Sequence, residues 1–188
     1  EQVLPGEDSD AARVVQEVFA ERGMTVLSRS RAESVVRTAD GVAVTLSDGS
    51  IVTGSHCLMA VGSVPNTQDL GLEAAGVAIS ESGHIIVDSV SRTNVRGIYA
   101  AGDCTGVFLL ASVAAMQGRI AMRHALGDAV RPLKLDTVAS NVFTDPEIAT
   151  VGVSQADVES GRERADVVML PLATNARAKM QGISKGFV

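Results

Sequence analysis

The sharpest chemical signal in the 188-residue sequence is the run GIYAAGDCTG at positions 97–106. Its apolar start, Ile98 to Ala101, predicts a short strand, and Gly102 would let the backbone approach a bound molecule closely. Asp103 then places a carboxylate at the carboxyl end of that strand, where it can accept hydrogen bonds from sugar-like hydroxyl groups. A surface aspartate that only caps a loop fits the same spacing equally well.

A helix is predicted shortly after the aspartate, from near Leu110 to about Leu126. Small side chains recur along it and would allow close packing against a sheet or a flat cofactor: Ala111, Ala114, Ala115, Gly118, Ala121 and Ala125. The free N–H groups and partial positive charge at its start would point back toward Asp103. Strand, glycine, aspartate, loop and helix start are therefore predicted to form one site; the alternative is a helix that is merely packed.

The elements before this motif indicate a mixed α/β architecture. One apolar stripe at helical spacing consists of Ala11, Val14, Val15, Val18 and Phe19. It predicts a helix that Asp8 or Ser9 would cap and that Gly23 would end. Because an amphipathic helix must bury its apolar stripe, Met24 to Leu27 is expected to be a strand that the helix covers.

A β meander is predicted next. Asp40-Gly41 and Asp48-Gly49 are typical hairpin turns, and the residues between them alternate in polarity as in a half-exposed strand. The following run, Cys57 to Gly62, is apolar throughout, which favours a strand buried on both faces of a layered fold. Such a strand would bring Gly62 to the edge of the sheet where ligands bind, but the residues alone favour a simple turn glycine.

Composition argues against several classes of function. The chain carries 16 Lys and Arg against 22 Asp and Glu, a net charge of −6, which disfavours a nucleic-acid partner. No apolar run is long enough to span a membrane and no signal peptide opens the chain, so we expect a cytoplasmic protein. Cys57 and Cys104 form no closely spaced pair, and His56, His84 and His124 do not cluster, so no metal site is predicted.

Three motifs in order resemble the flavoprotein disulfide reductase family, the dihydrolipoamide dehydrogenase-like oxidoreductases. GIYAAGDCTG resembles the second FAD motif of that family, and VGSVPNTQDLGL at 61–72 resembles the segment that leaves its NAD domain. VFTDPEIATVGVS at 142–154 is similar to the opening of the dimerisation domain, which LPLATNARAKMQGISKGFV at 170–188 continues. LLASVAAMQGRIAM at 109–122 is similar to an actinobacterial branch of NAD(P)H quinone reductases that lack the redox disulfide.

The resemblance implies roles for particular residues. Gly102 and Asp103 would bind FAD, the aspartate through the ribityl chain. The backbone of the helix start would meet the flavin pyrimidine ring through Leu109, Leu110, Ala111 and Ser112. Ala32 and Gly62 would line the NAD(P) site. The resemblance assigns no catalytic side chain and no metal ligand to this chain.

The resemblance also implies a fold and a domain order. Residues 1–65 would complete an NAD(P)-binding domain, residues 66–135 would form the second segment of an FAD-binding domain, and residues 136–188 would begin an α+β dimerisation domain. The chain would then be an internal fragment, unlikely to be active alone, of a homodimeric flavoprotein with two dinucleotide-binding domains. The family's CxxxxC disulfide would lie before residue 1 and its His–Glu pair after Val188.

The expected function is an FAD-dependent NAD(P)H dehydrogenase that passes electrons through flavin to a quinone-type acceptor. Lipoamide-reducing members usually have a histidine where Ser112 stands and acidic residues where Ala115 to Gln117 stand, which weakens that assignment. The family as a whole usually has an arginine where Ser63 stands. A dihydrolipoamide dehydrogenase or related disulfide reductase is nevertheless the alternative enzyme, and a non-catalytic dimerisation or binding module is the alternative of another class.

Overall fold

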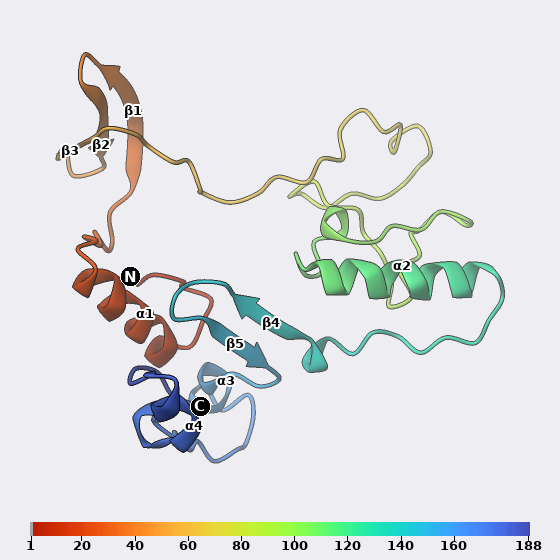
Figure 1. Cartoon of the computed structure of the whole chain (residues 1–188). Helices are drawn as coiled ribbons and strands as arrows, with labels where there is room; N and C mark the ends of the chain where they lie inside the picture. Colours follow the sequence, from red (N-terminus) through yellow and green to blue (C-terminus); the bar gives the residue numbers. More distant parts are fainter. Residues whose placement is uncertain (1) are drawn as a thin grey trace. The chain divides into compact units, whose positions relative to one another are not determined.

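The structure, a computed structural model, describes residues 2–188, which divide into two compact units (Figure 1). One unit comprises the chain up to Ala60 together with Asn141–Val188, and the other is Val61–Ser140. The helices are α1 (Ser9–Glu21), α2 (Ala111–Ala125), α3 (Gln155–Glu159) and α4 (Ala176–Met180). The strands are β1 (Ala32–Thr38), β2 (Gly41–Leu46), β3 (Ile51–Gly54), β4 (Ala139–Val142) and β5 (Ile148–Val151).

No helix among the described residues is both long and apolar enough to cross a bilayer.

Helix α1 confirms the predicted apolar stripe, because Val15 and Val18 are buried in the first unit. The helix ends at Glu21, and Gly23, just beyond it, has the expected left-handed conformation with a φ of +86°. Asp8 occupies the N-cap position, but its carboxylate does not cap α1. It instead accepts hydrogen bonds from the backbone N–H groups of Gln155 and Ala156, at 3.2 and 3.4 Å. The prediction that Asp8 caps α1 was therefore wrong. Its carboxylate binds the start of α3 instead, because unpaired N–H groups there lie within its reach.

Strands β1, β2 and β3 form the predicted antiparallel meander. Its turns fall at Asp40-Gly41 and Asp48-Gly49, as the sequence indicated. In the register, Val44 lies opposite Val35 of β1 and Val52 of β3. Only β2 is half-buried, whereas β1 and β3 are exposed along their whole lengths; all three strands belong to the first unit.

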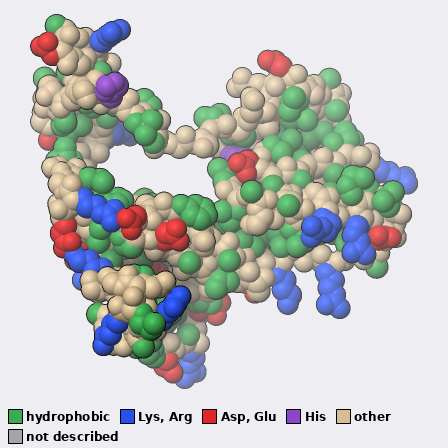
Figure 2. Space-filling view, in the orientation of Figure 1, with side chains coloured by type: hydrophobic (Ala, Val, Ile, Leu, Met, Phe, Trp, Pro, Cys, Tyr) green, Lys and Arg blue, Asp and Glu red, His purple; other side chains and the backbone are tan. Residues whose placement is uncertain are grey.

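Three predicted strands are absent from the described part of the chain. Met24 to Leu27 is irregular, and Cys57 to Gly62 is irregular and exposed, with Leu58 88% and Val61 85% accessible. Ile98 to Ala101 contributes only an isolated bridge, between Tyr99 and Arg92. A strand needs a partner along its whole edge, and no strand within residues 2–188 pairs with these segments. Figure 2 shows the many hydrophobic side chains left at the surface.

The second unit is built around α2, which confirms the predicted helix to within a residue at each end. It buries Val113, Ile120 and Ala121 together with one polar residue, Gln117. The chain before α2 forms short turns tied by single bridges, such as the one between Ile79 and Ile85. Long loops with few paired strands therefore make this unit depend on side-chain hydrogen bonds.

One such loop is held by Asp88. Its carboxylate accepts hydrogen bonds from the N–H groups of Val90 and Arg92, each at 3.0 Å, and forms an ion pair with the Arg92 guanidinium at 2.9 Å. Burial acts to raise the pKa of Asp88, but these hydrogen bonds and the charge of Arg92 outweigh it and place the pKa below the ordinary value of 3.8. The ionised carboxylate therefore stabilises the folded loop.

We expect this lowered pKa to appear as acid sensitivity. A carboxylate whose pKa is depressed in the folded state stabilises the protein above its unfolded pKa of about 3.9, and this contribution disappears as the pH falls through the folded pKa. Asp88→Asn keeps one acceptor oxygen and removes the titration, so its melting temperature should fall less steeply than that of the parent protein below about pH 4. Thermal unfolding followed by circular dichroism between acidic and neutral pH tests this. If the melting temperatures of the two proteins fell in parallel with decreasing pH, the stabilising role of ionised Asp88 would be contradicted.

Candidate functional site

The candidate site is the loop Gly102–Gly106 together with the start of α2, all within the second unit. Gly102 has a φ of +87°, and a Cβ atom on it would lie 3.2 Å from the Cβ of Ala114 on α2. The loop continues through the 3-10 turn Asp103–Thr105 and ends at Gly106 in the left-handed conformation. Glycine is required at Gly102 for both reasons, so the backbone before Asp103 lies directly against the helix.

Gln117 fastens this loop to α2 from inside the unit. Its side chain, in a residue only 5% exposed, accepts a hydrogen bond from the Gly102 N–H at 2.8 Å and donates one to the Thr105 hydroxyl at 3.3 Å. The Thr105 hydroxyl in turn donates to the Gly102 carbonyl at 2.7 Å. The three residues form a closed, buried hydrogen-bond network, which is the kind that holds a backbone in a single conformation.

The sequence analysis missed the role of Gln117. It treated this residue only as a departure from the acidic residues of lipoamide-reducing relatives. A signal for it was present, because Gln117 falls on the same helical face as Val113, Ile120 and Ala121. A polar side chain on an otherwise apolar helix face needs a buried partner.

The polar groups of the site that have no partner in the described protein are the Asp103 carboxylate and the first backbone N–H groups of α2. Asp103 is exposed, and within residues 2–188 its carboxylate has no hydrogen-bond or ion-pair partner. The first hydrogen bond of α2 runs from the Ala114 N–H to the Leu110 carbonyl at 3.0 Å, so the preceding N–H groups, including that of Ser112, have no acceptor in the helix. Leu110 supplies no side-chain cap. A carboxylate acceptor and a set of backbone donors therefore remain available to a ligand.

Of the other predicted site residues, Leu109 and Ala111 lie at the start of α2, whereas Ala32 and Gly62 lie outside the candidate site. Leu109 is exposed just before α2, in the same segment as Ala111. Ala32 is the first residue of β1 in the first unit, whereas Gly62 lies in the second unit with a φ of +120°. A shared NAD(P) site of Ala32 and Gly62 therefore stays a prediction.

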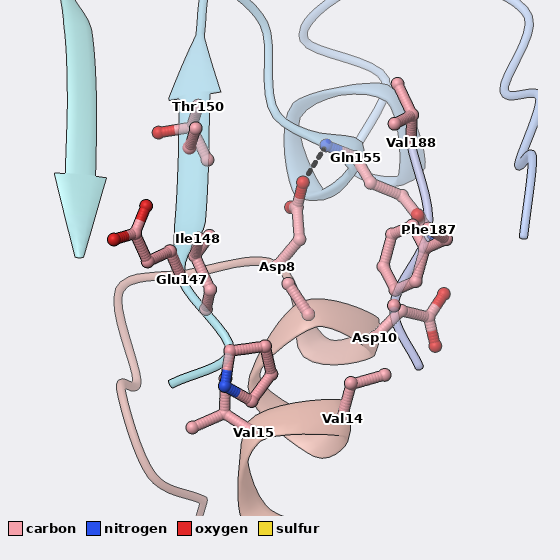
Figure 3. Close-up of a pocket in the computed structure, with 14 residues that line it drawn as sticks. Asp8, Asp10, Val14, Val15, Glu147, Ile148, Thr150, Gln155, Phe187 and Val188 are labelled. Carbon is pink, nitrogen blue, oxygen red and sulfur yellow. Dashed lines mark hydrogen bonds between the residues drawn. The ribbon is translucent and has the colours of Figure 1, made fainter. Parts of the chain in front are cut away.

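The first unit contains a separate cavity of about 260 Å³ between α1, β5 and the end of the chain (Figure 3). Three carboxylates, of Asp8, Asp10 and Glu147, line it beside apolar side chains such as Val15 and Phe187. Asp8 is already engaged by the start of α3, as the dashed line in Figure 3 shows, and Asp10 pairs with Arg13. None of the residues that the sequence predicted to bind a ligand lines this cavity.

The described residues contain neither a disulfide bond nor a group of side chains that could bind a metal ion. Cys57 is exposed and Cys104 is half-buried, and both are free. The Cys104 thiol donates to the Ala101 carbonyl at 3.4 Å. Within residues 2–188 no three His, Cys, Asp or Glu side chains are grouped so that they could hold a metal ion.

Two family models match the chain. Residues 1–118 match the model described as pyridine nucleotide-disulphide oxidoreductase. Residues 138–188 match the dimerisation domain of the same group. These two matches confirm the resemblance and the fold class that the motifs predicted.

Individual proteins agree with the family models. The chain is 59% identical over 99% of its length to the NAD(P)H dehydrogenase (quinone) of Mycobacterium tuberculosis, of which it covers 38%. It is 31% identical over its full length to the dihydrolipoyl dehydrogenase of Zymomonas mobilis, of which it covers 41%. The crystal structure of LpdA from Mycobacterium tuberculosis superposes on the whole chain with a TM-score of 0.94 and 58% identity, and the chain covers 41% of it. The chain thus spans about two fifths of the length of these relatives.

Replacing Gln117 should destabilise the second unit. In Gln117→Ala the buried Gly102 N–H loses its acceptor, which costs about 1–3 kcal/mol. For a unit of this size, each kcal/mol lowers the melting temperature by roughly 4–8 °C. Gln68→Ala is the matched control, because Gln68 is exposed and makes no side-chain hydrogen bond within residues 2–188. Differential scanning calorimetry gives the melting temperature of each variant. Equal melting temperatures for the two variants would show that the network does not hold the loop.

Proposed function

The chain belongs to the pyridine nucleotide-disulphide oxidoreductase family, and from this premise we propose that it acts in an FAD-dependent enzyme that passes electrons from NAD(P)H to a quinone-type acceptor. The observation that carries the proposal is the free Asp103 carboxylate, held next to α2 by the buried Gln117 network. The identity to the mycobacterial NAD(P)H dehydrogenase (quinone) supports the choice of acceptor.

The residues of the candidate site fit FAD. The ribityl chain of FAD carries hydroxyl groups, and the Asp103 carboxylate is a free acceptor for them. The N–H groups and the positive end of the dipole at the start of α2, near Ser112, favour negative charge on the pyrimidine side of the flavin. When bound, FAD supplies the redox chemistry between the nicotinamide and the acceptor.

The contribution of this chain is to bind and orient. Gly102 brings the backbone close to α2, so that Asp103 stands at a fixed place relative to the helix start. The N–H groups at the start of α2 are already aimed by the helix, so they stabilise charge without having to reorganise. Leu109 adds an exposed apolar side chain at the same place, where it would shield the ligand from water.

We further propose the division into domains and the assembly that the sequence suggested. Residues 1–65, of which residue 1 lies outside the described residues, would belong to the NAD(P)-binding domain, with Ala32 and Gly62 lining its site. Residues 66–135 would belong to the FAD-binding domain and residues 136–188 to the dimerisation domain. The match of residues 138–188 to a dimerisation domain supports a homodimer.

The variant Asp103→Ala tests the FAD site when it is made in the natively expressed protein, that is, the whole protein as its organism produces it. Loss of a charge-assisted hydrogen bond should weaken FAD binding by roughly 10- to 150-fold. Asp136→Ala is the matched control, because Asp136 is an exposed aspartate of the same unit without a side-chain hydrogen bond within residues 2–188. Flavin retained after dialysis and the dissociation constant from fluorescence titration are the measurements. Unchanged FAD binding in Asp103→Ala would count against the site.

The acceptor is tested by direct comparison of substrates. The natively expressed protein should oxidise NADH or NADPH faster with menadione than with lipoamide, because Ser112 stands where lipoamide-reducing relatives usually have a histidine. Steady-state kcat/KM for both acceptors is the measurement. Faster lipoamide turnover would favour a dihydrolipoamide dehydrogenase. A colourless protein, inert toward both nucleotides, would favour a non-catalytic module.

A further inference from the structure

His84 packs against the loop that carries Asp103. A Cβ atom built on Gly106 would lie 2.8 Å from both Cδ2 and Cγ of the His84 ring and 3.2 Å from its Nδ1. Such distances are too short for real Cβ atoms, so the imidazole fills the space that a side chain at position 106 would need. The sequence analysis gave His84 no role.

The His84 ring is itself held in place. Its Nδ1 lies 3.0 Å from the Ser82 hydroxyl, and its backbone N–H donates to the Ser80 hydroxyl at 3.1 Å. The turn that carries it is anchored by buried Thr67, whose hydroxyl donates to the Gly83 carbonyl at 2.7 Å. The ring is therefore a fixed surface against which the loop rests.

The backbone beside His84 also holds the loop. The Ile85 N–H donates to the Cys104 carbonyl at 2.8 Å, so the turn touches the loop at Cys104 and again at Gly106. Gln117 holds the other end of the loop, at Gly102. Asp103 lies between these two attachments.

We infer that His84 is a positioning residue for the FAD site: its ring fixes Gly106 and thereby the direction of the Asp103 carboxylate. The inference rests on the proposed function, because it assigns the carboxylate to FAD. The role is one of shape, since the His84 ring occupies the space beside Gly106 and makes no hydrogen bond to it within residues 2–188. A planar side chain at position 84 should therefore preserve FAD binding, whereas a small side chain should weaken it.

A double-mutant cycle in the natively expressed protein tests the contact. Gly106→Ala should weaken FAD binding by about tenfold or more, from the clash with the ring and from its left-handed backbone at φ +67°. The same change in a His84→Ala background should cost clearly less, because only the backbone strain remains. The measurements are the FAD dissociation constant and, in the FAD-free protein, hydrogen exchange of the loop amides. An equal effect of Gly106→Ala in both backgrounds would overturn the inference.

Conservative variants separate positioning from folding. His84→Phe keeps a planar ring and should retain the FAD affinity within about threefold and the flavin absorption spectrum, whereas His84→Ala should lose affinity and speed exchange of the loop amides. His56→Ala, at an exposed position of the other unit, is the control and should change neither. If His84→Ala and His84→Phe behave alike, the inference is wrong. Because hydrogen exchange needs no FAD, it decides the role of His84 even where Asp103→Ala disproves the FAD site.

Discussion

The buried hydrogen bond from the Gly102 N–H to the Gln117 side chain is the constraint on which the candidate site depends. A backbone N–H removed from water must find an acceptor, and among residues 2–188 no strand pairs with the loop to offer one. Gln117 supplies this acceptor and, through Thr105, also satisfies the carbonyl of the same glycine. The helix and the loop are thus joined by polar groups that cannot be exchanged for water without cost.

This arrangement explains why the groups proposed to bind FAD are free of partners within the described residues. The inner polar atoms of the loop are satisfied inside the unit, so the Asp103 carboxylate is not needed to hold the fold. The first N–H groups of α2 likewise have no side-chain cap, which a stable helix end would normally have. The missing cap costs stability, and both features offer hydrogen-bonding capacity to a ligand with hydroxyl groups and a region of negative charge. The same loop thereby links the fold to the proposed FAD chemistry.

Local patterns in the sequence predicted the local structure well. The apolar stripe of α1, the extent of α2 and the Asp-Gly turns of the meander depend on neighbouring residues, and the structure confirms them. Of the small residues expected to pack closely along α2, only Ala121 is buried. The strand predicted at Cys57 to Gly62 failed because an apolar run reports only a preference for burial, and the strand also needs a paired edge. His84 was missed because it meets the loop across a long stretch of sequence, through a contact that no local pattern encodes. The helix pattern places Gln117 on the buried face of α2, but it does not tell which groups the side chain binds.

The central claim is tested most directly by a crystal structure of the natively expressed protein grown with FAD. The account predicts a ribityl hydroxyl within hydrogen-bond distance of the Asp103 carboxylate and the pyrimidine edge facing the N–H groups that begin α2, with the bond from Gly102 to Gln117 intact. FAD bound elsewhere, with Asp103 in open solvent, would contradict it.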